Sequence, residues 1–425
     1  MASSKAVSCL RHSPVLLFAA ESVNSAAGTL LTVGLLFYMT HRFGWDARGN
    51  FTVAACQGTL YVVGALSAKR LARRWKRIAV LQVLYGVLSV FALAAGFCAS
   101  AGLSIPMAAI VAMEACMMGA SWPLLESLVS AAGDAGTLSR RLGWYNIVWA
   151  IAGAIALATS GAVIQHLPAW AFFGIVAALH ICGGLMITFR RFLRASITGA
   201  QPVTQTLPTD AAAPAGEASA RRLRLALWLA RIALPATYVI IFSLAPALPT
   251  LYAIGRLSPT LATVQCSIWF VARAAAFIIL GNTAFWRRQP VLILWATVAM
   301  LAGFIGTLVF GSLTSMAPAL LLMAVAQSLL GLSLGTIYAS SLYFGMAVSK
   351  GSTEHGGYHE ALIGLGQVLG PVVGVVTQWI RPGELCPVAA GISLVVTATI
   401  ITETIVGIRI AGSVKAMIRR NPAFE

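Results

Sequence analysis

The chain has 425 residues, of which 59% are hydrophobic and only 10% are charged, and its mean hydropathy is +0.86. A soluble globule of this length needs more charged residues to cover its surface, so the composition excludes that class and predicts an all-helical membrane protein. The net charge of +17 does not indicate a nucleic-acid partner, because the cations lie in short runs between long apolar segments. The expected partner is the lipid bilayer.

Twelve apolar segments follow one another along the chain, and each has about the length that a helix needs to cross the hydrocarbon. Helices are required there, because lipid offers no hydrogen-bond partner to an open backbone. The predicted spans are residues 15–40, 51–68, 78–100, 104–129, 142–164, 169–189, 225–252, 261–282, 290–311, 317–345, 358–380 and 385–410.

A polar stretch divides these spans into two groups of six. Residues 190–224 begin and end with arginines, and the segment between them is rich in Ala, Pro, Thr and Ser. Such a segment cannot bury enough apolar surface to offset the entropy of ordering it, so a flexible linker is predicted. The predicted domains are an N-terminal six-helix half (1–189), the linker (190–224) and a C-terminal six-helix half with a short tail (225–425).

The distribution of charge between the loops predicts the orientation in the membrane. If the N-terminus is cytoplasmic, 23 of the 29 cations fall on the inner side, four on the outer side and two within spans. Cytoplasmic loops carry the excess of Lys and Arg in membrane proteins. We therefore expect a multi-pass protein of a bacterial inner membrane, with the linker and both termini in the cytoplasm.

The fifth and eleventh spans share one sequence pattern, G-x-Y-[N/H]-x6-G-x7-G, which runs from Gly143 to Gly161 and from Gly356 to Gly374. These spans occupy equivalent places in a chain of six plus six helices, which indicates two repeated halves. Small residues on one helix face let a neighbouring helix approach closely, so Gly153, Gly161, Gly366 and Gly374 are expected to pack against other helices. Two matched halves are what alternating access requires, with the binding site between them at the midplane.

The chain resembles the major facilitator superfamily over nearly its whole length, in its twelve spans, its central cytoplasmic linker and the basic loop after the second span. The segment from Gly64 to Arg74 looks like the family's signature G-x-L-[A/S]-D-[R/K]-x-G-[R/K]-[R/K] with one residue inserted before the second glycine, although Ala68 replaces the acidic residue and Ala72 that second glycine. The resemblance implies a gating loop that contains Gly64, Lys69, Arg70, Arg73 and Arg74.

A second segment, from Gly366 to Gly374, is similar to the G-x3-G-P-x2-G-G motif that the family's drug/proton antiporters carry in their fifth span. Here the motif lies in the eleventh span, and the fifth span lacks the proline, so antiport is not inferred from it. Gly370 and Pro371 join the residues expected to shape helix packing.

Ionisable residues within the membrane are costly and are candidates for function. The resemblance implies that spans one, four, seven and ten line the cavity, which favours Glu21 and Glu114 as proton-coupling residues. Burial disfavours the charged form of a carboxyl group, so we expect Glu114 either to carry a proton or to pair with one of the two intramembrane cations. The candidates for substrate binding are these two cations, Arg231 and Arg273, and four polar residues of the predicted spans: Asn24, Gln57, Gln265 and Gln327.

Structural roles are the alternative for several of these residues. Glu21 and Arg231 could form an ion pair that holds the halves together, and the glutamines could bond neighbouring helices. Glu126 and Glu360 are expected near the cations of the inner gate rather than at the substrate. His180, alone on span six, is expected to be a core residue.

Enzymatic chemistry is not predicted. The G-x-S-x-G sequence from Gly331 to Gly335 lies inside a helical span, whereas a nucleophile elbow needs a strand-to-helix turn. No nucleotide-binding loop is present, and the seven cysteines show no CxxC spacing, so we expect neither a cofactor nor a metal site.

The sequence therefore predicts a monomeric secondary active transporter of a small solute, driven by a proton gradient, with an anionic substrate as one expectation because of Arg231 and Arg273. Two alternatives remain open. One is the efflux of amphipathic compounds by proton antiport, and the other is a membrane sensor or scaffold that does not transport.

Overall fold

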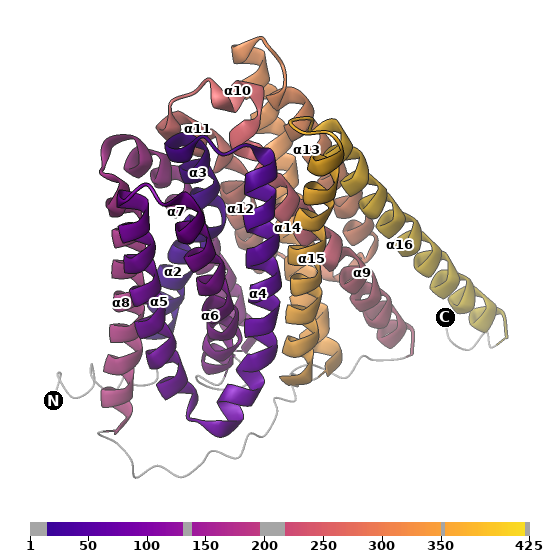
Figure 1. Ribbon diagram of the computed structural model, residues 1–425. Helices are drawn as coiled ribbons and strands as arrows, with labels where there is room; N and C mark the ends of the chain where they lie inside the picture. Colours follow the sequence, from indigo (N-terminus) through magenta and orange to yellow (C-terminus); the bar gives the residue numbers. More distant parts are fainter. Residues whose placement is uncertain (1–14, 131–137, 196–216, 350–352, 421–425) are drawn as a thin grey trace.

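The computed structural model describes residues 15–130, 138–195, 217–349 and 353–420, and these residues are almost entirely helical (Figure 1). Short π- and 3-10 segments interrupt or follow the helices at η1 (Leu30–Gly34), η3 (Leu248–Thr250) and η4 (Phe285–Arg288). The α-helices are α2 (Val15–Thr29), α3 (Leu35–Phe43), α4 (Ala47–Arg74), α5 (Arg77–Ser100), α6 (Ser104–Ser130), α7 (Leu138–His166), α8 (Ala169–Ala195), α9 (Glu217–Ala247), α10 (Tyr252–Gly255), α11 (Pro259–Cys266), α12 (Ile268–Asn282), α13 (Val291–Gly311), α14 (Met316–Ser349), α15 (Thr353–Ile380) and α16 (Cys386–Arg420).

Twelve helical spans are long and apolar enough to cross a membrane, which confirms the predicted all-α, multi-pass architecture. Each predicted span coincides with one observed span. Several helices extend beyond the predicted spans: α16 was predicted to end at residue 410 but continues to Arg420, and the second span was predicted to end at residue 68 but continues as helix to Arg74. Leu, Ala, Lys and Arg are good helix formers, and the long basic side chains can reach the membrane surface while the backbone stays helical.

Helix also extends into both ends of the predicted linker. α8 continues to Ala195 and α9 begins at Glu217, whereas the linker was predicted to occupy residues 190–224. The segment 196–216 lies outside the described residues. The arginine-containing ends of this range therefore prolong spans six and seven.

The shared glycine pattern produces equivalent helix crossings in the two halves. A Cβ on Gly153 of α7 would lie 2.9 Å from the Thr29 hydroxyl in span one, and a Cβ on Gly366 of α15 would lie 2.5 Å from the Pro235 carbonyl in span seven. Each crossing therefore joins the fifth helix of a half to the first helix of the same half.

The second glycine of each pattern meets the opposite half. Gly161 approaches the Pro259 carbonyl at the start of span eight, and Gly374 approaches the ring of Phe51 in span two. Spans two and eight hold equivalent places in the two halves. The two halves are thus joined along two pseudo-symmetric seams, α7 with α11 and α4 with α15.

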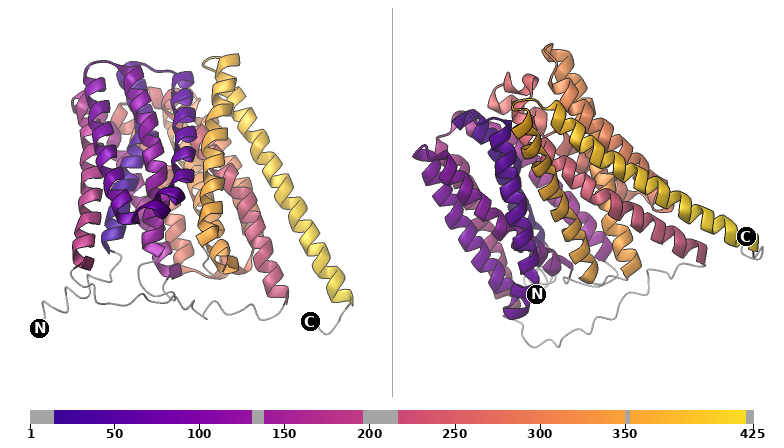
Figure 2. Two further views of the ribbon diagram at one scale, coloured as in Figure 1. Left: turned by 60° about the horizontal axis from the view of Figure 1, so that its bottom comes forward. Right: turned by 45° about the vertical axis from the view of Figure 1, so that its right-hand side comes forward.

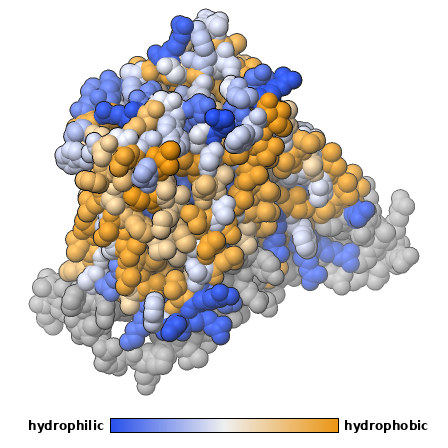
Figure 3. Space-filling model, in the orientation of Figure 1, coloured by the Kyte–Doolittle hydropathy of each residue, from blue (hydrophilic) through white to orange (hydrophobic). Residues whose placement is uncertain are grey.

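Burial separates central spans from peripheral ones. In the most apolar 18-residue window of each span, 78% of span one is buried but only 17% of span twelve. Figure 3 shows an apolar band across the visible face of the molecule, with hydrophilic residues above and below it. Span one therefore lies at the centre of the bundle, and α16, which forms span twelve, lies at its edge and faces the lipid.

Polar contacts join the two halves near one end of the bundle. We call this end the outer end, and the end where α2 begins the inner end, following the topology predicted from the loop charges. Asn50 donates to the Pro246 carbonyl, the Gly161 amide donates to the Thr263 hydroxyl at 3.0 Å, and the Thr260 hydroxyl donates to Gln165 at 2.8 Å. Figures 1 and 2 show α9 and α16 diverging from the N-terminal half toward the inner end. The structure therefore represents a state in which the outer ends are held together.

The crossing at Gly366 predicts a sharp intolerance to larger side chains. Gly366→Leu should lower the apparent Tm of the purified protein, because overpacking against Pro235 and Tyr238 costs about 1–3 kcal/mol. Gly86→Leu is the matched control, since a Cβ on Gly86 meets no atom within 4 Å. If both variants unfold at the same temperature as the wild type, Gly366 does not hold α15 against α9.

Candidate functional site

A cavity of about 170 Å³ lies between the two halves. Its N-terminal wall comes from α2, η1, α4, α6 and α7, and its C-terminal wall comes from α9, α12, α14 and α15. These elements belong to spans one, two, four and five of one half and to the equivalent spans seven, eight, ten and eleven of the other. Equivalent spans of the two halves therefore line the cavity from opposite sides, and they carry different side chains there.

Three carboxyl groups reach this cavity, from both halves. Glu21 comes from α2 and Glu126 from α6, whereas Glu360 comes from α15. Glu126 and Glu360 are close enough for their charges to interact. Glu126 and Glu360 are both partly exposed, and like charges on them repel one another.

Glu21 is the most buried of the three, with 1% of its surface exposed. Its Oε1 accepts hydrogen bonds from the Ser25 hydroxyl at 2.7 Å and from Nε1 of Trp122 at 3.1 Å. Its Oε2 makes no well-formed hydrogen bond among the described residues, although the Tyr145 hydroxyl lies near the carboxyl group. One side of this carboxyl group is thus fixed by the protein, and the other is available to a proton or a ligand.

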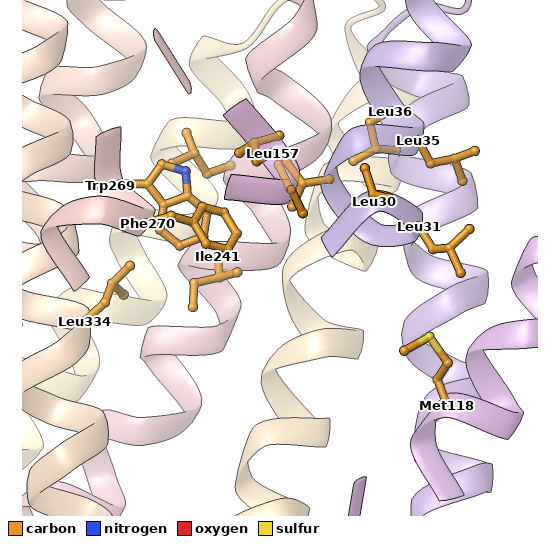
Figure 4. Packing of buried hydrophobic residues seen from close by; sticks show 14 of the residues in the cluster. Leu30, Leu31, Leu35, Leu36, Met118, Leu157, Ile241, Trp269, Phe270 and Leu334 are labelled. Carbon is orange, nitrogen blue, oxygen red and sulfur yellow. The ribbon is translucent and has the colours of Figure 1, made fainter. Parts of the chain in front are cut away.

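Arg273 is the cation of the described cavity lining, and aromatic rings surround it. Its Cζ lies 4.5 Å from the ring centre of Trp149, 4.6 Å from Phe270 and 5.1 Å from Trp269. Trp149 belongs to the N-terminal half, so this cation–π contact spans the two halves. Figure 4 shows Trp269 and Phe270 beside one another in the packed layer, and their ring centres are 4.0 Å apart.

Aromatic side chains form much of the remaining wall. The rings of Tyr61 and Trp122 are 5.9 Å apart and lie next to Glu21 and Glu360. Trp149 also contacts Tyr338 at 5.5 Å and Phe277 at 5.4 Å across the interface. Rings of this kind supply flat apolar surfaces and, through their faces, attraction for cations.

Span one changes its helical period beside the cavity. Residues Leu30–Gly34 form a π-helical turn, and two of them, Thr32 and Val33, line the cavity. The Leu31 carbonyl accepts a hydrogen bond of 2.9 Å from Nε2 of Gln57 on α4. Such π-turns are frequent at functional sites, because they re-aim the side chains of a helix.

The structure brings together only some of the residues predicted from the sequence. Glu21, Gln57 and Arg273 line the cavity. The other predicted substrate-binding residues lie outside the lining that the described residues form: Asn24, Arg231, Gln265 and Gln327. Gln265 instead donates a hydrogen bond of 3.1 Å to the Leu320 carbonyl on α14, so it connects two helices of one half.

Glu114 also lies outside the cavity. Its Oε1 is 3.2 Å from Nε2 of His180 on α8, and both side chains are fully buried within the N-terminal half. The expectation that Glu114 pairs with Arg231 or Arg273 is therefore wrong. The neighbouring residue Ala115 faces the cavity, so the helical rotation of one residue turns Glu114 toward α8.

The predicted gating loop is helical. Residues 64–74 form the last turns of α4, and the carbonyl of Cys116 on α6 leaves no room for a side chain at Gly64. Gly64 is therefore a crossing point between helices rather than a loop residue. Beyond it, the basic residues of this segment extend to the inner end of the bundle: Lys69, Arg70, Arg73 and Arg74.

Sequence reasoning missed two of the three cavity carboxyl groups, because it placed Glu126 and Glu360 at an inner gate. A helical spacing of polar and aromatic residues was the available signal. Trp122 and Glu126 are four residues apart, as are Tyr145 and Trp149, and in each pair both residues line the cavity. Residues four apart lie on the same helix face, so such pairs mark a shared surface. Among the described residues, no group of His, Cys, Asp and Glu has the arrangement of a metal site.

The buried pair of Glu114 and His180 predicts coupled effects of mutation. Glu114→Ala and His180→Ala should each lower the apparent Tm, because each leaves a buried polar partner unpaired. The double variant should lose less than the sum of the two, with a coupling of about 0.5–3 kcal/mol. Thermal unfolding of the four proteins in detergent measures this coupling, and strictly additive losses would show that the two side chains do not interact.

No protein-family profile matches the chain, and no curated protein sequence matches it significantly. Solved structures match over most of its length. The nucleoside transporter NupG aligns in two crystal structures with TM-scores of 0.64 and 0.61 at 16% identity, covering 92% of this chain and 99% and 98% of theirs. A bacterial homologue of the human lysosomal transporter Spinster, in an inward-facing and unoccupied conformation, aligns with a TM-score of 0.55 at 16% identity, covering 92% of this chain and 94% of its own. The chain therefore shares the fold of these transporter structures.

Proposed function

We propose that this protein is a secondary active transporter that moves a small solute by alternating access and couples the movement to protons. The observation that carries the proposal is the convergence of carboxyl groups from both halves in one cavity between those halves. The transporter structures that share the fold support the transport class.

The proposed coupling follows from repulsion across the cavity. When Glu126 and Glu360 are both ionised, their charges oppose closure of the inner end, because closure brings the two groups together and expels the water that screens them. A proton or a cationic solute removes that repulsion and allows the inner end to close. In alternating access the two halves rock against one another, so closure of the inner end favours release of the contacts that hold the outer end.

The geometry changes which residues we propose for coupling. Glu21 keeps the role predicted for it, and Glu126 and Glu360 join it. Glu114 is assigned a structural role instead, because it faces His180 and not the cavity. The seam contact of Arg273 with Trp149 joins the halves on the cavity wall, so we propose that this contact breaks or shifts when the halves rotate.

The expectation of an anionic substrate depended on Arg231 and Arg273. Only Arg273 lines the cavity, and its guanidinium group already packs against three aromatic rings. The aromatic walls favour the second candidate, the efflux of amphipathic compounds by proton antiport, because flat apolar surfaces bind such compounds. We further propose a monomer in a bacterial inner membrane, with cytoplasmic termini because this orientation places the excess of Lys and Arg on the inner side.

A distance measurement across the outer end tests this function without knowledge of the substrate. Gln165→Cys and Thr260→Cys, in a background without the seven native cysteines, carry spin labels on the two halves at a hydrogen-bonded contact. As the pH falls from about 8 to about 5, protonation of the cavity carboxyl groups should let the inner end close, and the fraction of long outer distances should rise.

The matched control is the same labelled pair with Glu21→Gln, Glu126→Gln and Glu360→Gln. Its distance distribution should no longer depend on pH, because the groups that titrate have been removed. A single short distance at every pH in the labelled parent would contradict transport and favour a sensor or scaffold that does not change state.

A further inference from the structure

Unpartnered hydrogen-bonding atoms in the cavity divide between two regions. Three acceptor atoms make no well-formed hydrogen bond among the described residues, namely Oε2 of Glu21, Oε2 of Glu360 and Oε1 of Gln367, although the hydroxyl groups of Tyr145 and Tyr61 lie near the Glu21 and Glu360 carboxyl groups respectively. Gln367 is 93% buried and uncharged, so it is an observation independent of the carboxyl groups. The unpartnered donors of the lining, Nε1 of Trp269 and Nε of Arg273, lie together on α12 within the aromatic cluster. The wall formed by α2 and α15 is thus rich in acceptors.

Buried acceptors without a partner are unfavourable unless a ligand supplies hydrogen-bond donors. The charge of the lining points in the same direction, because three carboxyl groups face one guanidinium. An anionic ligand at the α2–α15 wall would add a further acceptor and a further negative charge. A ligand with N–H donors and a positive charge satisfies both requirements at once.

The aromatic residues beside the acceptors can bind the rest of such a ligand. Trp122 is oriented by its hydrogen bond to Glu21, and its ring lies 5.9 Å from that of Tyr61. Arg273 shows that a cation in this cavity is held against ring faces, at 4.5–5.1 Å from three of them. The surfaces of Trp122 and Tyr61 offer the same interaction beside a carboxyl group instead of a guanidinium.

We infer that the substrate is a small organic cation, a protonated amine attached to an aromatic or other apolar body, whose ammonium group binds Glu21 and whose body packs on Trp122 and Tyr61. This inference rests on the transport function proposed above. When the ammonium group donates to ionised Glu21, the proton that had neutralised this carboxyl group is released to solvent. One cation is then exchanged for one proton, so charge balances across the step.

Calorimetric titration of the purified protein tests the substrate class with three probes of matched size. 2-Phenylethylamine is a cation near neutral pH, 2-phenylethanol is its neutral counterpart, and phenylacetate is an anion with the same ring. The amine should bind at least about tenfold more tightly than the other two, because charge-assisted hydrogen bonds to a buried carboxylate are lost without the ammonium group.

Two variants assign the binding to this wall. Glu21→Gln should weaken binding of the amine at least about tenfold and leave the weak binding of the alcohol unchanged. Glu403→Gln is the matched control, since Glu403 is an equally buried carboxyl group on α16 that lies outside the described cavity lining, and it should bind the amine as the wild type does. Similar unfolding temperatures of the two variants show that both are folded.

The outer-end distance measurement separates failure of this inference from failure of the transport function. If the outer end opens and closes with pH but phenylacetate or the alcohol binds as tightly as the amine, the substrate class is wrong and transport stands. Binding of none of the probes to a protein that still switches also overturns the substrate class. If no switching occurs under any condition, the transport function itself fails.

Discussion

Repulsion between carboxyl groups of the two halves is the interaction on which this account depends. Glu21 and Glu126 from one half line the same cavity as Glu360 from the other. In the function proposed above, a proton or a cation must neutralise this charge before the inner ends can close. A single electrostatic requirement thus links occupancy of the site to the conformation of the whole bundle, which is what distinguishes a coupled transporter from a channel or a scaffold.

The helix packing places these groups and lets them separate. Gly153 and Gly366 fix the fifth helix of each half against the first, so each half moves as a unit. The contacts between the halves at Gly161 and Gly374 bring backbone and side chains together at the outer end, with few polar bonds to break. Rigid halves joined by such seams can rotate without repacking their cores.

Hydropathy and loop charge were enough to predict the architecture, because the bilayer imposes the length and composition of each span. The repeated glycines could be recognised because small residues at helix crossings are a local requirement. Contacts between distant helices could not be predicted in this way. The sequence gives no distance between Glu114 and His180, and one helical step decides whether Glu114 or Ala115 faces the cavity. Glu360 was assigned to the inner gate because it lies near the end of a span. The residues that other helices place beside it could not be identified from the sequence.

Reversal of one charge tests the central electrostatic claim most directly. In a protein without native cysteines, Ala115→Cys places a thiol in the cavity lining, and its rate of labelling by a membrane-impermeant reagent from the inner side reports whether the inner end is open. Adding Glu360→Lys replaces repulsion with attraction to Glu126 and should slow labelling strongly, with Glu360→Gln intermediate. Equal labelling rates in all three proteins would contradict the claim that charge across the cavity controls closure.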